Sequence, residues 1–472
     1  MSLVKKASKT FLWTILGNLI GFGMQLYIAK ILGATEYGKA NVIFGITGMY
    51  VVFFNFGLPW LIVREISVSD TKKSDKILSE YIILYWILDI LFFPLIYYIT
   101  KYSLIKSNMF SSINIFYVIV LFLLMQISDI IFNYYVGKRK QNISSFIKSF
   151  LIKIIFMVSF FLIYIFIYDY KALVISQILS LIIPTIILIK KFSFPYKLNF
   201  FHIIKNSWQY YLLTVTYSLY TNISKVLQKI YSTNEMVGYL SLGIMLGTLG
   251  DILGSVLANI AIPEFASYSK NKDYEKIKIL FQKISRYNTY IILPIVIFTL
   301  FNLKRLISFL GKDYEKGFLI ISIIVISKFF DSFVGPNGTL LNMSGHQKFE
   351  IFNGLTMIFV GITTGIILGN KFEWGIAASI ALSAIIVNVL KFIEVGIIFK
   401  IYPYTKYTLF YILINSFLYS LVFYLTKGLS SILFWIIING IITIIAIIFF
   451  FVFSPIKEDK NFIISYIQKL LS

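Results

Sequence analysis

The stretch that decides the fold is FLWTILGNLIGFGMQLYIAKIL, which runs from Phe11 to Leu32 and holds a single charged residue, Lys30. A helix rises about 1.5 Å per residue, so roughly twenty apolar residues cross a hydrocarbon core of about 30 Å. The stretch has no small-residue cleavage site. We therefore expect a retained membrane helix rather than a signal peptide.

Similar apolar runs recur along the whole chain of 472 residues, of which 58% are hydrophobic and only 14% are charged. The runs are continuous rather than alternating, which excludes a membrane β-barrel. The sequence thus predicts an all-α polytopic membrane protein with about fourteen transmembrane helices. The expected spans start near Phe11, Ala40, Leu78, Ile113, Phe146, Ala172, Ser207, Met236, Tyr287, Gly317, Phe349, Trp374, Thr405 and Ser430.

The orientation follows from the lysine and arginine residues of the short loops, which collect on the cytoplasmic side of a membrane. With the N-terminus inside, the inner segments hold more than twice as many as the outer loops. The outer loop after the ninth span is the exception. We expect both termini in the cytoplasm and the protein in the plasma membrane, because the net charge of +22 suits the anionic inner leaflet better than nucleic acid.

A weak internal repeat has an offset of about two hundred residues. After the first span the chain reads LGATEYG (Leu32–Gly38), and after the seventh it reads EMVGY (Glu235–Tyr239). Such short matches also arise by chance in apolar sequence. If the repeat is real, residues 1–200 and 201–402 form two related six-helix bundles, and residues 403–472 add two helices and an amphipathic cytoplasmic tail.

Several motifs in order resemble a known family. They are TFLWTILGNLIGFGMQLYIAKILGATEYG (Thr10–Gly38), NFGLPWLIVRE (Asn55–Glu65), EMVGYLSLG (Glu235–Gly243), FLGKDYEKG (Phe309–Gly317) and SGHQK (Ser344–Lys348). Together they resemble the polysaccharide or O-antigen repeat-unit flippases of the multidrug, oligosaccharidyl-lipid and polysaccharide (MOP) exporter superfamily. The order of the elements is more specific than any one of them.

The resemblance implies fourteen helices, in two pseudo-symmetric six-helix bundles plus two C-terminal helices. It implies alternating access that moves undecaprenyl-diphosphate-linked oligosaccharides across the plasma membrane for O-antigen, capsule or exopolysaccharide. Its partners would be that substrate, membrane lipids, a coupling ion (H⁺ or Na⁺) and polymerase machinery, with a monomeric protein and no cofactor. One departure is that Asn222 and Ser224 stand where many relatives carry an Arg-x-Asp pair, which puts their ion coupling in doubt here.

Charged residues inside the spans are candidates for function, because a charge near mid-bilayer costs about 2.5–3.5 kcal/mol on insertion scales. Lys328 with Asp331, and Lys391 with Glu394, are each three residues apart, so they could pair on one helix face. A role with substrate is about equally favoured. For Lys153, snorkelling to the cytoplasmic surface is the preferred interpretation. The charged residues of this group are Asp89, Asp129, Lys153, Lys225, Asp251, Lys328, Asp331, Lys391 and Glu394.

Polar stripes along two spans offer hydroxyls, amides and aromatic faces suited to sugars. The seventh span carries one stripe and the first a narrower one, and hydrogen bonding between helices is the alternative for both. Arg64, at the inner end of the second span, could bind the lipid diphosphate, because guanidinium binds phosphate oxygens bidentately; a membrane-side anchor is equally favoured. The candidates for substrate binding are Arg64, Lys225, Lys328, Lys391, Tyr210, Thr214, Tyr217, Thr221, Asn222, Asn18 and Gln25.

Asp251 is the first candidate for proton or cation coupling, because no basic residue lies three or four positions away. A buried carboxylate without a fixed cation can change protonation during a transport cycle. Asp89 and Asp129 are weaker candidates on the same argument, and Asp331 is a further one.

Three other patterns predict local structure. Gly243 with Gly247, and Gly250 with Gly254, are small-residue pairs that let helices approach closely. The sequence Pro336-Asn337-Gly338 could break the tenth span. The segment from Asp273 to Arg286 repeats apolar residues at helical spacing, which predicts a helix lying in the membrane interface.

The sequence also excludes several activities. It has no cysteine and only two histidines, His202 and His346, so no thiol chemistry or histidine-based metal site is expected. It has no P-loop, so the chain does not hydrolyse ATP by itself. We expect no enzymatic activity. Two rivals to the flippase stay open: a cation-coupled multidrug exporter of the same superfamily, and a membrane polysaccharide polymerase or ligase.

Overall fold

The computed structural model describes residues 3–67, 69, 71–106, 111–192, 200–403, 406–426 and 432–453. Within these residues the chain is helical with short turns and has no strand. Each predicted span coincides with a helical segment, which confirms the all-α fold class. The cause is the solvent, because a backbone in hydrocarbon must satisfy its hydrogen bonds internally.

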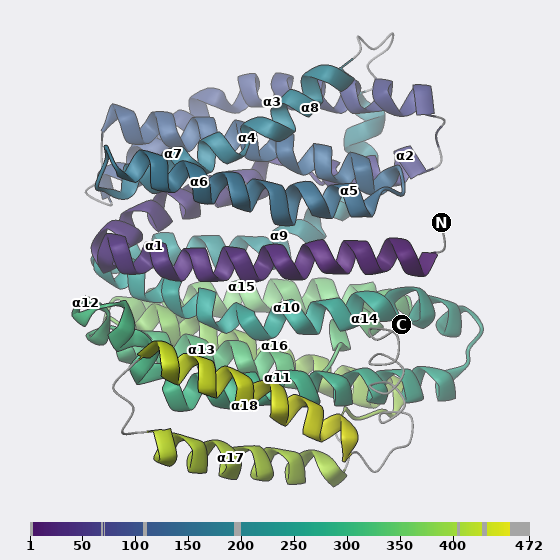
Figure 1. Cartoon of the computed structure of the whole chain (residues 1–472). Helices are drawn as coiled ribbons and strands as arrows, with labels where there is room; N and C mark the ends of the chain where they lie inside the picture. Colours follow the sequence, from purple (N-terminus) through teal and green to yellow (C-terminus); the bar gives the residue numbers. More distant parts are fainter. Residues whose placement is uncertain are drawn as a thin grey trace. The chain divides into compact units, whose positions relative to one another are not determined.

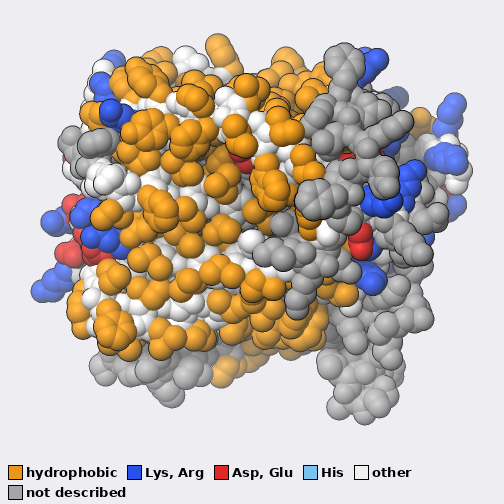
Figure 2. Space-filling model, turned by 90° about the horizontal axis from the view of Figure 1, so that it is seen from above, with side chains coloured by type: hydrophobic (Ala, Val, Ile, Leu, Met, Phe, Trp, Pro, Cys, Tyr) orange, Lys and Arg blue, Asp and Glu red, His pale blue; other side chains and the backbone are white. Residues whose placement is uncertain are grey.

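Eight helical stretches of the described residues are long and apolar enough to cross a membrane, and shorter apolar helices accompany them. Figure 2 shows hydrophobic side chains over most of one face, with charged side chains gathered toward two opposite edges. Such a band is what a bilayer requires of a protein surface. The chain is therefore a multi-pass membrane protein.

The chain divides into two compact units (Figure 1). Unit 1 contains residues 1–242 and 354–379, and unit 2 contains residues 243–353 and 380–472. The helices α10 (Asn234–Lys270), α15 (Gln347–Gly369) and α16 (Gly375–Phe399) contribute residues to both. The proposed division into bundles at 1–200 and 201–402 stays a prediction.

Unit 1 otherwise contains helices α1 (Leu3–Phe54), α2 (Leu58–Ser67), α3 (Thr71–Lys106), α4 (Ser112–Gly137), α5 (Gln141–Ser145), η1 (Phe146–Leu151), α6 (Ile152–Tyr164), α7 (Tyr170–Ser180), α8 (Ile182–Lys191) and α9 (Phe200–Tyr231). Unit 2 otherwise contains α11 (Tyr274–Leu310), α12 (Lys312–Glu315), α13 (Phe318–Phe333), α14 (Asn337–Met343), α17 (Lys406–Thr426) and α18 (Ile432–Val452).

Helix α1 joins the first two predicted spans across a kink at Gly33, whose φ of 71° and ψ of 170° are not helical. A side chain would strain that backbone, so glycine is the residue that fits. The kink turns the chain back within LGATEYG, the motif that the sequence placed between two spans. Helix α1 therefore consists of two helical segments that meet at the Gly33 kink, and they correspond to the first two predicted spans.

The two loops of the predicted repeat pack against each other within unit 1. An added Cβ on Gly38 would lie 1.8 Å from the backbone oxygen of Asn234, and one on Gly238 would lie 2.1 Å from that of Ala34. The repeat offset of about two hundred residues relates Gly38 to Gly238 and Ala34 to Asn234, so it converts each contact into the other. A two-fold relation between repeats requires that reciprocity.

The segment from Asp273 to Arg286 is not a separate interfacial helix, so that prediction was wrong. Its residues from Tyr274 onward form the first turns of the continuous helix α11. Ile277, Phe281 and Ile284 are buried in a cluster with Phe265 of α10 and other apolar residues of unit 2. The amphipathic pattern therefore reports a face packed on protein rather than on lipid.

The predicted break of the tenth span is confirmed: α13 ends at Phe333 and α14 begins at Asn337, with Gly335 between them at φ +85°. The close packing predicted for the first glycine pair is also confirmed. Added Cβ atoms on Gly243 and Gly247 would lie 3.0 Å from Ile324 Cβ and 2.5 Å from Lys328 Cβ. The side chains near Gly250 and Gly254 lie outside the described residues.

We predict that Gly38→Ala lowers the melting temperature of the purified protein, because the new methyl group overlaps the Asn234 carbonyl. Overpacking of this kind costs about 1–3 kcal/mol. Gly23→Ala is the control, since a Cβ there meets nothing within 4 Å in the same helix. Intrinsic fluorescence during heating in detergent measures both, and an equal response of the two variants would contradict the loop contact.

Candidate functional site

Two lysines in the apolar helices of unit 1 are held by asparagines of α1. Lys225 Nζ on α9 donates to Asn41 Oδ1 at 3.1 Å, and the Asn41 amide nitrogen donates to the Tyr37 carbonyl at 3.0 Å. An ammonium has three donors and no acceptor. The neutral amide therefore orients Lys225 without neutralising its charge.

Lys153 repeats this arrangement in the other half of α1. Its Nζ donates to Asn18 Oδ1 at 2.7 Å, and its side chain lies against Gly21. The Lys153 side chain thus reaches across to α1, and the interpretation that it snorkels to the cytoplasmic surface stays a prediction. Lys153 is the second residue of α6, which directly follows the π-helical turn η1; such turns are rare and are frequent at functional sites.

The polar stripe of α9 divides between helix contacts and exposed positions. Asn222 lies against Gly48 of α1, whose added Cβ would be 2.4 Å from Asn222 Oδ1. Tyr210 packs on an apolar cluster of unit 1, Thr214 donates to the Tyr210 carbonyl at 2.9 Å, and Thr221 is exposed. For Asn222 and Tyr210 the structure favours packing between helices.

Gln25, the other polar residue of the first-span stripe, accepts a hydrogen bond from the Tyr37 hydroxyl at 3.2 Å. This contact joins the segments of α1 on the two sides of the Gly33 kink. Asn18, Gln25 and Asn41 thus all point to partners rather than standing as isolated polar groups.

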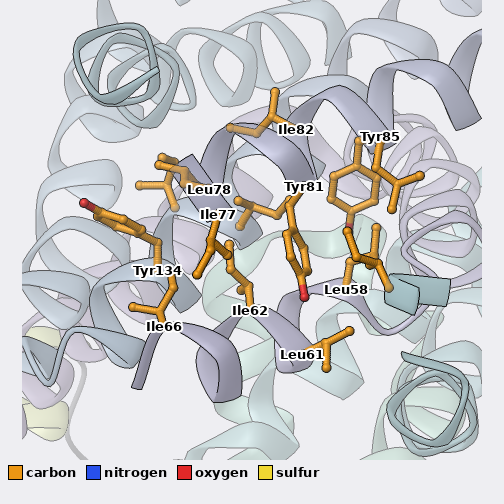
Figure 3. Close-up of a cluster of buried hydrophobic side chains, with 14 residues drawn as sticks. Leu58, Leu61, Ile62, Ile66, Ile77, Leu78, Tyr81, Ile82, Tyr85 and Tyr134 are labelled. Carbon is orange, nitrogen blue, oxygen red and sulfur yellow. The ribbon is translucent and has the colours of Figure 1, made fainter. Parts of the chain in front are cut away.

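Arg64 is exposed in the last turn of α2, and the opposite face of α2 fixes its position. Leu58, Leu61, Ile62 and Ile66 are buried against α3 and α4 in the cluster shown in Figure 3. The turn before α2 is set by Gly57, at φ +73°, whose added Cβ would lie 2.4 Å from the Ser207 carbonyl of α9. A rigid apolar support therefore presents the Arg64 guanidinium to solvent.

Asp89 on α3 and Asp129 on α4 both lie in the neighbourhood of Tyr85. The Tyr85 hydroxyl donates to the Asn55 carbonyl at 3.2 Å. Asp89 is buried, and its Oδ1 has no hydrogen-bond partner. The sequence treated these two carboxylates as separate candidates, and the structure places both near Tyr85, which bonds to the break between α1 and α2.

The intrahelical pair expected between Lys391 and Glu394 was wrong. Lys391 Nζ lies 3.1 Å from Glu350 Oε2, on the neighbouring helix α15. Glu394 Oε2 instead accepts from Asn353 Nδ2 at 2.7 Å. Both bonds join α15 to α16 within unit 2. Long side chains on adjacent helices can meet at their polar ends.

The structure does not describe the side chains of three candidates. These are Tyr217, Asp251 and Asp331, whose backbones belong to α9, α10 and α13. The pair expected between Lys328 and Asp331 therefore stays a prediction. Lys328 packs against Gly247 of α10.

Sequence reasoning missed Asn41, Glu350 and Asn353. Asn41 lies four residues after Tyr37, on the same face of the helix that begins within the motif LGATEYG. That spacing is only a weak signal for a functional residue. Glu350 lies in the first turn of α15, where a carboxylate is common for reasons of the helix dipole alone. Among the described residues, no group of three or more His, Cys, Asp and Glu side chains could hold a metal ion.

Comparison with known proteins agrees with this architecture. The family model described as "Polysaccharide biosynthesis protein" matches residues 3–269. No curated protein matches the chain in sequence.

Solved structures with the same fold include lipid II flippase MurJ in an inward closed conformation, with a TM-score of 0.70, 18% identity, and coverage of 93% of this chain and 97% of that chain. An inward-facing multidrug resistance MATE family transporter of the MOP superfamily has a TM-score of 0.65, 10% identity, and coverage of 81% and 94%. A MOP superfamily transporter from Pyrococcus furiosus has a TM-score of 0.58, 14% identity, and coverage of 84% and 96%. The fold is that of this superfamily.

We predict that Lys391→Met destabilises the protein and that Glu350→Gln in the same chain restores most of the loss. Removing one partner of a buried ion pair leaves an uncompensated charge and costs about 3–5 kcal/mol. Glu394→Gln added to Lys391→Met is the matched control, and it should restore less. Melting temperatures of the wild type and these three variants measure the coupling; greater rescue by Glu394→Gln would assign the pair to α16 instead.

Proposed function

We propose that this chain, which belongs to the polysaccharide biosynthesis protein family, is a flippase for lipid-linked oligosaccharides. It moves undecaprenyl-diphosphate-linked repeat units across the plasma membrane by alternating access, for O-antigen, capsule or exopolysaccharide synthesis. The family match and the superfamily fold support a transporter of such lipids. The chain is proposed to act as a monomer, without enzymatic activity or cofactor, beside polymerase machinery.

The observation that carries this proposal is the pair of amide-held lysines in unit 1. Lys153 and Lys225 lie in apolar helices, and each uses one donor on an asparagine. A charge in such a place is costly unless a partner or water compensates it. An anionic lipid diphosphate would compensate both, because phosphate oxygens accept charge-assisted hydrogen bonds from ammonium groups.

The other candidates extend the same proposal. Arg64 is exposed and would meet the diphosphate at the inner end of α2, where guanidinium can bind it bidentately. Thr221, Tyr217 and Lys328 would serve the sugars or phosphates along the path, and Asp251, Asp331, Asp89 and Asp129 would serve coupling to H⁺ or Na⁺. With both termini in the cytoplasm, Arg64 lies on the side where the lipid-linked substrate is made.

The main rival is a cation-coupled multidrug exporter, since MATE transporters share the fold. The two amide-held lysines of unit 1 argue against it. A site for cationic drugs presents carboxylates, whereas Lys153 and Lys225 present ammonium groups whose hydrogen-bond partners are neutral amides. A polymerase or ligase is the second rival, and it would act on the same lipid carrier after its transport.

We predict that Lys225→Met and Lys153→Met each lower the rate of lipid-linked oligosaccharide transport at least about tenfold, the equivalent of one lost interaction of about 1.4 kcal/mol. Lys171→Met is the control, because Lys171 forms a surface ion pair with Asp169. Transport into proteoliposomes is measured with a fluorescent lipid-linked oligosaccharide, and the amount of inserted protein is checked for each variant. Unchanged transport in both lysine variants would remove them from the substrate path.

The leaflet that holds the substrate in a deletion strain tests the function itself. Without a flippase, lipid-linked oligosaccharide should accumulate on the cytoplasmic face, where membrane-impermeant enzymes or lectins cannot reach it. Accumulation on the outer face would identify a polymerase or ligase. No change in lipid-linked oligosaccharide, together with new sensitivity to cationic drugs, would identify a drug exporter.

A further inference from the structure

Three helices are followed by a lysine or arginine with a left-handed backbone, which is unusual. Among the residues that the structure describes, four that are not glycine have a positive φ, and three of these are Arg139 at 56°, Lys272 at 55° and Lys400 at 57°. They lie just beyond the ends of α4, α10 and α16. Long side chains are uncommon at such angles, because Cβ crowds the following carbonyl oxygen.

The hydrogen bonds around Lys272 are those of a helix C-cap that normally contains glycine. The Lys272 nitrogen donates to the Ser269 carbonyl at 3.0 Å, and the Asp273 nitrogen donates to the Tyr268 carbonyl at 2.9 Å. Glycine is the usual residue at the left-handed position of this motif. The backbone alone would therefore favour glycine, so the reason for a lysine must come from its side chain.

The helix dipole does not require this lysine. A cation near a helix C-terminus is favourable, and α10 already has Lys270 in its last turn. A second cation beyond that turn adds little, because the effect falls off outside the last turn. The Lys272 and Lys400 side chains are exposed, and among the described residues neither has an ion-pair partner. A ligand outside the chain would explain both.

Lys272 and Lys400 lie at the same corner of unit 2. The ring of Tyr274, at the start of α11, is 6.5 Å from the ring of Phe399, the last residue of α16. Helix α11 and the residues that end α16 also share a buried apolar cluster. Lys272 is two residues from Tyr274 and Lys400 adjoins Phe399, so the fold brings two cations from distant parts of the sequence together.

Positive charge prevails at this corner. The Lys276 ammonium pairs with the Asp273 carboxylate at 2.6 Å, which leaves the other lysines uncompensated by that carboxylate. Five lysines stand against two carboxylates, so positive charge is in excess by three. The charged residues of the corner are Lys270, Lys272, Lys276, Lys278, Lys400, Asp273 and Glu275.

Exposed aromatic and apolar side chains lie beside these charges. Tyr274 is 56% exposed, Tyr402 55% and Ile279 60%. Tyrosines gather at the boundary between membrane and water, because the ring is apolar and the hydroxyl is polar. The two lysines flank the ends of α11 and α16, which are both long and apolar enough to cross a membrane. The corner therefore suits the depth of the lipid headgroups.

We propose that Lys272 and Lys400 bind the headgroup of an anionic phospholipid, such as phosphatidylglycerol, in the cytoplasmic leaflet. Each ammonium offers three donors, and charge-assisted hydrogen bonds to phosphate oxygens are stronger than neutral ones. The exposed tyrosines and the apolar helices favour a lipid over a soluble anion. The leaflet follows from the predicted orientation of the chain, whereas the site itself does not depend on the proposed transport function.

Lipid binding is measured on the purified full chain without a transport assay. The protein is heated in dodecyl maltoside micelles that contain rising mole fractions of phosphatidylglycerol or phosphatidylcholine. The ionic strength is held constant, because salt screens exposed charges. A ligand that binds only the folded state raises the melting temperature once its concentration exceeds Kd. We expect a saturable rise with phosphatidylglycerol that phosphatidylcholine does not reproduce.

Asparagine variants assign the lipid to the two lysines. Lys272→Asn combined with Lys400→Asn removes both charges and keeps the left-handed backbone, which asparagine tolerates. This double variant should need at least about ten times more phosphatidylglycerol for half-maximal stabilisation, which corresponds to about 1.4 kcal/mol. Lys316→Asn combined with Lys371→Asn is the matched control, because both lysines are exposed, lie just beyond the ends of α12 and α15, and carry the same total charge.

A glycine variant separates the charge of the side chain from the strain of the backbone. Lys272→Gly relieves the strain at a φ of 55°, so it should raise the melting temperature in micelles without phospholipid. The same variant should gain less than the wild type from phosphatidylglycerol. These opposite effects keep the test decisive if the asparagine double variant folds poorly.

Three results would overturn the proposal. The first is a wild-type protein that phosphatidylglycerol stabilises no more than phosphatidylcholine does. The second is an unchanged lipid response in both the asparagine double variant and Lys272→Gly, or an equal loss in the control. The third is an equal rise with inorganic phosphate in phosphatidylcholine micelles at the same ionic strength, which would show that a soluble anion suffices.

Discussion

The structure depends on one constraint: inside a hydrocarbon core no water is present to pair with polar groups. The backbone answers by forming helices, and the few polar side chains must find partners on neighbouring helices. Lys225 and Lys153 reach asparagines of α1, and Lys391 reaches Glu350 of α15. The same demand that makes the chain helical therefore also decides where the charged residues point.

The two units meet this constraint in different ways. In unit 1 the intramembrane lysines rest on neutral amides, so their positive charge is oriented but not cancelled. In unit 2 the Lys391 ammonium instead pairs with the Glu350 carboxylate. The positive charge that stays uncancelled in unit 1 suits an anionic ligand, in agreement with the proposed function.

Glycines set how closely the helices approach each other. Gly45 and Gly48 of α1 let Asn222 and Lys225 of α9 lie against that helix, and Gly21 makes room for Lys153. Because a glycine has no side chain, the two helix backbones can approach closely, and side-chain hydrogen bonds can then form across the helices. Lys225 and Lys153 therefore each combine a polar partner with a glycine beside the aliphatic part of the side chain.

The sequence by itself determined the solvent, the helices and the family. Span positions, the broken tenth span and the first glycine pair all follow from residues close together in the chain, where run length and helical period act. Only the tertiary structure decided the partners. Asn41 and Lys225 are 184 residues apart, and Asn18 and Lys153 are 135 apart. The spacing of Lys391 and Glu394 favoured a local pair, but Lys391 pairs with Glu350 on the neighbouring helix α15. The amphipathic start of α11 likewise could not show whether lipid or protein covers it, because an apolar face has the same pattern against either.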